Sequence, residues 1–107
     1  MNPLDPASFV DDVEVRVGHG ESDAFVSERL FRRLVLIGQA YGLHRLGLLD
    51  SDAELSPLQA DGLLHELLFV RALVPQDEAL MSVIVEMTPL VERSARSTAD
   101  PLLIEWN

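Results

Sequence analysis

Residues 56–74 read SPLQADGLLHELLFVRALV and carry the clearest helix signal in this chain of 107 residues. Ser56 is a favourable N-cap, Pro57 suits the first helical position because its missing N–H has no partner there, and Gln59 can reach back to the cap. The stretch therefore predicts a central helix that ends before Pro75. One broad face at helical spacing is apolar and is expected to pack on the core: Ala60, Leu63, Leu64, Leu67, Val70 and Val74.

A second face of this predicted helix is also largely apolar. It holds Leu58, Gly62, His65, Phe69 and Leu73. One small core does not use both faces, and large exposed apolar patches on small domains usually mark contacts. The second face is therefore a candidate protein interface. The alternative is that the N-terminal segment or residues 43–49 cover it.

A strand is expected near the start of the chain. In residues 12–18, Val13, Val15 and Val17 alternate with Glu14 and Arg16, a period of two that is typical of a half-buried strand. Residues 1–10 contain two prolines among small and polar residues and predict an irregular N-terminal arm. Residues 11–107 are expected to form a single domain.

A first helix is predicted over residues 23–41. The polar stretch before it, residues 18–23 (GHGESD), is expected to be a turn in which Ser22 or Asp23 caps the helix, and Gly42 is a natural stop. The expected core face is Val26, Leu30, Leu34, Ile37 and Tyr41. The opposite face is a second candidate interface, basic and partly apolar: Phe25, Arg29, Arg32 and Leu36.

The rest of the chain predicts a turn, a helix and a strand. Residues 43–49 are apolar but short and interrupted by glycine, so they are expected to be a turn whose leucines enter the core. Residues 77–97 predict a third helix, kinked but continuous at Pro89, with a break at Thr88 as the alternative. Residues 102–106 alternate like the first strand. The expected fold is α+β in the order β-α-α-α-β, with the two terminal strands paired in a two-stranded sheet beside a three-helix core.

Charge and composition exclude several classes of protein. The chain has 18 acidic residues against 8 basic ones, a net charge of −10 that would repel a phosphate backbone, so no nucleic acid is expected as a partner. All the basic residues are arginine, and there is no cysteine, which rules out lysine Schiff bases, P-loop lysines, disulfides and thiolate sites. No basic leader and no apolar run of membrane-spanning length is seen, so the sequence predicts a cytoplasmic protein without a membrane partner.

The residues that could be catalytic or could bind a metal form no recognisable site in the sequence. The loop over residues 18–23 brings together His19, Ser22 and two carboxylates, but it matches no known ligand spacing, and a polar turn explains it equally well. His44 and His65 are not spaced for zinc, and Asp61, Glu66 and Asp77 are among the acidic residues predicted to lie on solvent faces. No hydrolase, nucleotide-binding or metalloprotease motif is present, so no catalytic, cofactor-binding or metal-binding residue is assigned.

The sequence thus favours a small non-catalytic protein that acts through protein–protein contacts as a homodimer, its partner being itself or another protein. The central helix's second face and the free edges of the terminal strand pair are both surfaces that a second copy could cover. Two alternatives stay open. One is an acidic inhibitor or immunity-type protein that masks a basic partner, and the other is a small enzyme or ligand-binding protein that uses the loop from Gly18 to Asp23.

Overall fold

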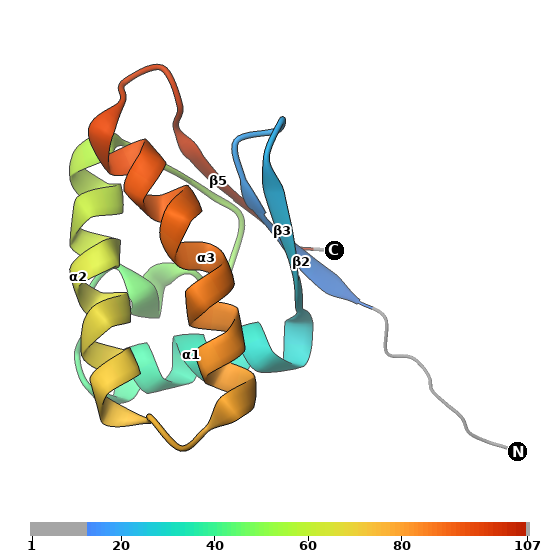
Figure 1. Ribbon diagram of the computed structural model, residues 1–107, viewed down its shortest axis with the longest axis vertical. Coiled ribbons are helices and arrows are strands. Elements are labelled where there is room, and N and C mark those ends of the chain that lie inside the picture. The colour runs from blue at the N-terminus through green and yellow to red at the C-terminus, as the bar shows by residue number, and fades with distance from the viewer. Residues whose placement is uncertain (1–12, 107) are drawn as a thin grey trace, which may run out of the picture.

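The protein folds into a layer of helices packed on one face of a sheet, as the computed structural model shows (Figure 1). The structure describes residues 13–106, so the predicted irregular arm over residues 1–10 lies outside the described part of the chain. The fold class, α+β, is as the sequence predicts. The elements in chain order are β2 (Glu14–Gly18), β3 (Asp23–Ser27), α1 (Glu28–Ala40), a short 3-10 helix η1 (Leu46–Leu48), β4 (Ala53–Leu55), α2 (Pro57–Leu73), α3 (Glu78–Arg96) and β5 (Leu102–Glu105).

The sheet has four antiparallel strands in the order β3-β2-β5-β4. The predicted pairing of the two terminal strands is confirmed, since β2 lies against β5 with Val17 opposite Ile104. The prediction that these two strands form the whole sheet is wrong. β3 pairs with β2 on one side and β4 pairs with β5 on the other, so both predicted strands are central and each gains a second neighbour.

β3 occupies residues that were expected to form the first turn of the first helix. Ala24 and Val26 are buried and Phe25 between them is exposed, which is the period of a strand. The helix begins only at Glu28, where the Ser27 side chain accepts a hydrogen bond from the Leu30 N–H as an N-cap. Val26 fits the apolar spacing of a strand and also that of a helix, so the sequence pattern alone could not distinguish the two.

The turn between β2 and β3 is a tight hairpin. The His19 N–H donates to the Ser22 carbonyl at 3.0 Å, and Gly20 has a φ of +90°. A Cβ at Gly18 would collide with the Ser22 carbonyl oxygen and the Asp23 carboxylate, so glycine is required there by close approach. The polar stretch is therefore a turn, as predicted, but it joins two strands instead of a strand and a helix.

β4 was not predicted. It is three residues long and follows the polar residues Asp50, Ser51 and Asp52. β4 is a strand because it pairs with β5, with Ala53 opposite Ile104 and Leu55 opposite Leu102. The Trp106 N–H then donates to Asp52 Oδ1 at 2.8 Å, which extends this contact past the end of the strands.

The first residues of α2 and α3 confirm the helix starts that the sequence predicted. At α2, the Gln59 N–H donates to Ser56 Oγ and the Ser56 N–H to Gln59 Oε1, which is the predicted capping box. Asp77 caps α3, and this helix runs without interruption through Pro89, so the alternative of a break at Thr88 is wrong.

The core lies between the helices and the inner face of the sheet. Residues 43–49 contribute Leu46 and Leu49, both buried, and Leu43 is partly buried, as predicted. Two predicted core residues are exposed: Tyr41, at 55%, lies just beyond the end of α1, and Val13, at 46%, precedes β2 and does not share the buried face of Val15 and Val17. The side chains with the least exposure are Val15, Val17, Phe31, Leu34, Leu46, Ala60, Leu63, Leu67, Val70, Leu80, Ile84, Met87, Val91, Leu102 and Ile104.

Candidate protein interfaces

The predicted interface residues lie on two separate surfaces of the fold. Leu58, Gly62, His65, Phe69 and Leu73 belong to α2, and together with Tyr41 they are called the α2 surface below. Phe25 belongs to β3, while Arg29, Arg32 and Leu36 lie on α1. In Figure 1, α2 and β3 lie at opposite sides of the molecule. The structure therefore separates Phe25 from the α2 surface.

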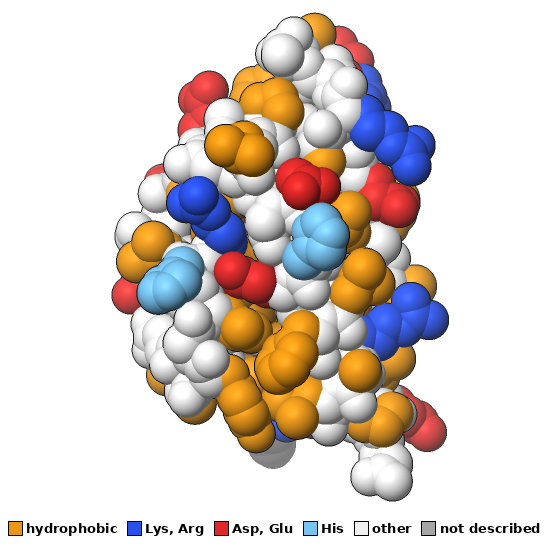
Figure 2. Space-filling view, turned by 90° about the vertical axis from the view of Figure 1, so that its left-hand side faces the viewer, with side chains coloured by type: hydrophobic (Ala, Val, Ile, Leu, Met, Phe, Trp, Pro, Cys, Tyr) orange, Lys and Arg blue, Asp and Glu red, His pale blue; other side chains and the backbone are white. Residues whose placement is uncertain are grey.

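The α2 surface is apolar and open toward the C-terminal end of the helix. Phe69 is 47% exposed, and its ring contacts the ring of Tyr41 edge to face, with centroids 6.0 Å apart. Leu73, one turn further along α2, is also exposed. Figure 2 looks onto this side of the molecule and shows hydrophobic side chains gathered in its lower part, with histidine, arginine and acidic side chains above them. Tyr41 was predicted to be a core residue, and its exposure adds it to this cluster.

The N-terminal half of the same helix face is less uniform. Leu58 is exposed, but Gly62 is half-buried because the Arg45 side chain lies over it, with Cγ 3.2 Å from the position that a Cβ would take. The expectation that residues 43–49 cover the second face of α2 is therefore met at Gly62. Residues 43–49 do not cover Phe69 and Leu73, which are exposed. The alternative that the N-terminal segment covers them lies outside the described residues.

His65 and Glu66 differ in their roles. His65 is exposed, and its Nδ1 lies 2.9 Å from the Asp61 carbonyl one turn earlier. Glu66 was predicted to be solvated, which is wrong: its carboxylate accepts hydrogen bonds from the backbone N–H groups of Arg45 and Leu46 at 2.7–3.1 Å. Glu66 thus holds η1 against α2 by satisfying N–H groups at the start of η1. The sequence carries no local signal for this contact between distant residues.

The surface around Phe25 is formed by the outer face of the sheet. Phe25 lies opposite Arg16 on β2, and Arg16 forms an ion pair with Glu105 on β5. Since side chains alternate across a strand, these three residues point away from the buried Val15, Val17 and Ile104. Phe25 is 55% exposed on this face.

The predicted α1 residues have unequal environments. Arg32 pairs with Glu28, four residues earlier on the same helix, at 3.4 Å, and its guanidinium carbon lies 5.1 Å from the centre of the Trp106 ring. Leu36 is 55% exposed. Arg29 forms no ion pair within residues 13–106. Arg32 is therefore engaged by the fold, whereas Arg29 and Leu36 remain open to a partner.

The loop over residues 18–23 contains one contact that sequence reasoning missed. His19 Nε2 lies 2.7 Å from Ser94 Oγ, and Ser94 Oγ donates to the Asp100 carbonyl at 2.7 Å. Because the single hydroxyl proton is used for Asp100, Nε2 is the donor toward Ser94. A serine nucleophile would need the opposite arrangement and an accessible oxygen, but Ser94 is fully buried. The pair ties the hairpin to the end of α3.

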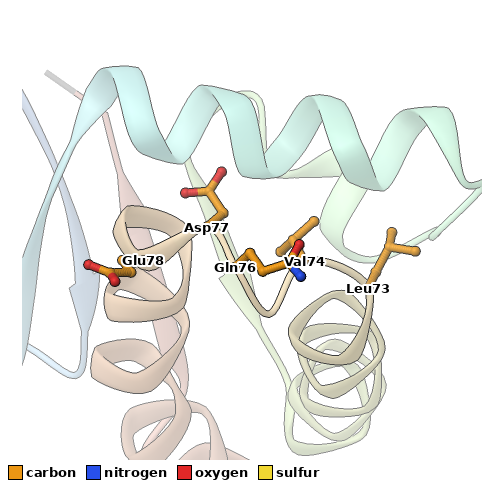
Figure 3. Close-up of a pocket in the computed structure, with 5 residues that line it drawn as sticks. All are labelled: Leu73, Val74, Gln76, Asp77 and Glu78. Atoms are coloured by element: carbon orange, nitrogen blue, oxygen red, sulfur yellow. The ribbon is translucent and has the colours of Figure 1, made fainter.

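A hollow lies at the α2–α3 connection and has a volume of about 680 Å³. Figure 3 shows the five lining residues, with the Asp77 side chain directed toward α1 and Glu78 directed away from it. Asp77 caps α3 and forms an ion pair with Arg33 of α1 at 2.5 Å. The hydrogen bond from the Leu80 N–H, together with Arg33, lowers the pKa of Asp77 below 3.8. The Asp77 carboxylate therefore has a structural role: it caps α3 and joins it to α1.

Residues 13–106 show neither a cluster of metal ligands nor a membrane-spanning helix. Among these residues, no group of three or more histidine or acidic side chains is placed to hold a metal ion. The helices that they form are too short or too polar to cross a bilayer. Comparisons of the chain with protein-family models, with curated proteins and with solved structures gave no match.

Proposed function

We propose that this protein is non-catalytic, is homodimeric and works in the cytoplasm through protein–protein contacts. The observation that carries the contact with other proteins is the exposed aromatic and aliphatic cluster of the α2 surface, above all Phe69, Leu73 and Tyr41. The homodimer is supported by the open edge of the sheet at β3, which a second copy could cover. Aromatic side chains are enriched among the residues that dominate binding energy at protein interfaces. The fold itself does not require apolar residues at these exposed positions.

The composition of the α2 surface also indicates what it binds. Its apolar part suits the apolar surface of a protein, and the chain's charge of −10 disfavours a nucleic acid there. Histidine, arginine and acidic side chains beside the apolar part form the polar rim that is usual at protein interfaces (Figure 2).

The first test is the mass of the protein in solution. Light scattering over a concentration series is expected to give the mass of two chains at high micromolar concentration. A mass of one chain throughout would remove the homodimer from the proposal. Phe69→Asp and Leu73→Asp examine the α2 surface in the same experiment, and Val85→Asp, at an exposed position on α3, is the matched control.

A second candidate function is favoured by the unpaired acidic residues. Within residues 13–106, Glu54, Glu78 and Glu86 form no ion pair, and all three are exposed. Such a surface would attract a basic protein quickly and in a salt-sensitive way, as an inhibitor or immunity-type protein does. A pull-down from the native cytoplasm at low and high salt tests this function. It requires a basic partner that is recovered at low salt and lost at high salt.

A further inference from the structure

We propose that two copies of this chain associate through the free edge of β3, pairing antiparallel about a twofold axis at Phe25. The inference rests on the homodimer of the proposed function and assigns the surface and register of its contact. The sheets of the two copies would then run on into each other through the paired β3 strands. Both α2 surfaces would remain outside the dimer contact, free for other proteins.

The hydrogen-bond pattern shows which backbone groups β3 leaves free. The His19 N–H donates to Ser22 and the Glu28 N–H to Val13, each at 3.0 Å. Hydrogen-bonded pairs alternate along an antiparallel ladder, so Ala24 and Val26 bond to β2 between these two points. The N–H groups of Asp23, Phe25 and Ser27 and the carbonyls of Asp23 and Phe25 therefore point away from β2. β3 is the end strand of the sheet, with no described strand beyond it.

The edge of β3 lacks the usual protection against pairing. Natural edge strands are short, or carry proline, lysine or a bulge. β3 has five residues, DAFVS, which include neither proline nor lysine, and its register with β2 is continuous. The other edge strand, β4, has only three residues. β3 is thus the edge that offers an uninterrupted row of backbone donors and acceptors.

The register centred on Phe25 is self-complementary. Phe25 lies opposite Phe25 of the second copy, and each donates its N–H to the other's carbonyl. Ser27 lies opposite Asp23, so that its N–H donates to the Asp23 carbonyl at both ends of the pairing. The two exposed phenyl rings meet on the outer face of the joined sheet, where cross-strand aromatic pairs stabilise a sheet. No two like charges face each other.

Complementary charges lie just beyond the two ends of the paired strands. Arg29 follows the C-terminal end of β3 in one copy and Glu21 precedes the N-terminal end of β3 in the other, so antiparallel pairing places both at the same end of the contact, twice by symmetry. Within residues 13–106 neither side chain forms an ion pair. An arginine and a glutamate left unpaired in one chain are thus brought to the same end of the contact. This match points to a second copy as the occupant of the edge.

The decisive experiment compares two surfaces by light scattering. Phe25→Asp is expected to give a monomer, because two carboxylates would face each other across the twofold axis. Phe69→Asp, on the α2 surface, is expected to leave the dimer intact. Phe25→Pro is a second variant, which adds no charge. It removes an N–H that points away from β2, so it should weaken the pairing between copies and keep the pairing of β3 with β2. Far-UV circular dichroism checks that each variant is folded.

Charge reversal tests the register. Arg29→Glu and Glu21→Arg should each raise the dimer dissociation constant roughly tenfold, since each places like charges at both ends of the contact. The double variant should return it toward the wild-type value, which a merely structural role of either residue would not produce.

The outcomes separate the two proposals. A wild-type monomer overturns the homodimer itself. A wild-type dimer that Phe69→Asp dissociates and Phe25→Asp does not overturns the β3 contact alone and leaves the homodimer in place. A dimer that both charge reversals weaken without rescue by the double variant overturns the register centred on Phe25.

Discussion

At the scale of single residues, buried polar contacts join parts of the chain that are far apart in sequence. His19, Ser94 and the Asp100 carbonyl form one chain of hydrogen bonds between the hairpin, α3 and the turn after α3. His19 Nδ1 is buried without a partner in the described chain, which suits an unprotonated nitrogen. Ser94 lies on an otherwise apolar helix face, so its hydroxyl has to be satisfied inside the protein.

Ser94→Ala is expected to lower the free energy of unfolding by about 1–3 kcal/mol, because it leaves both the His19 N–H and the Asp100 carbonyl without their partner. Urea denaturation measures the change. Ser82→Ala, at an exposed position of the same helix, is the control and should be nearly neutral. Equal losses in the two variants would contradict the role given to Ser94.

The Asp77 carboxylate should make stability depend on pH in the acid range. Its folded pKa lies below 3.8 because of the Leu80 N–H and Arg33, so its ionised form stabilises the fold above that value. This contribution is lost as the pH falls through the folded pKa. Asp77→Asn keeps a capping side chain without the charge. Unfolding free energies measured from pH 7 to pH 2.5 should show the wild-type advantage at neutral pH disappearing in acid, and a constant difference would contradict the assignment.

At the scale of elements, β5 is one of the two central strands of the sheet. It lies between β2 and β4, and its buried Leu102 and Ile104 face the helices. Removing β5 would expose this part of the core and leave β4 without any strand partner. An edge element such as β4 would be far less costly to lose.

Deletion of residues 102–107 is therefore expected to unfold the domain or to lower its melting temperature strongly. Differential scanning calorimetry of the truncated chain tests this. A melting temperature within a degree or two of that of the full chain would contradict the central position assigned to β5.

At the scale of the whole molecule, charge distinguishes self-association from binding to a basic partner. Two chains that each carry −10 repel each other at long range, and salt screens this repulsion beyond about 8 Å at physiological ionic strength. Contact through apolar residues and backbone hydrogen bonds is little affected by salt.

The homodimer should therefore persist, or tighten slightly, as salt is raised from low to physiological concentration. Sedimentation equilibrium at several salt concentrations provides the measurement. A dimer that dissociates as salt rises would show that attraction between opposite charges holds it together, contrary to a contact centred on Phe25.

The candidate interfaces were predicted less completely than the helices. Leu58, Phe69 and Leu73 are exposed on one helix face, as the spacing indicated. Tyr41 and Glu66 were misjudged, since burial depends on which segment packs against them. The free edge of β3 was not predicted at all, because the strand itself was not.

The sequence by itself determined the features that arise within a few neighbouring residues. The Ser56 capping box and the alternation of β2 and β5 follow from local hydrogen bonding and side-chain spacing. Pro89 removes a helix hydrogen bond, so the sequence left a break at Thr88 open and only the structure decided that the helix is continuous. Only the tertiary structure decided that residues 23–27 and 53–55 are strands. A helix satisfies its backbone groups internally, whereas a strand satisfies them on a neighbour, so short strands exist only where β2 and β5 offer that neighbour.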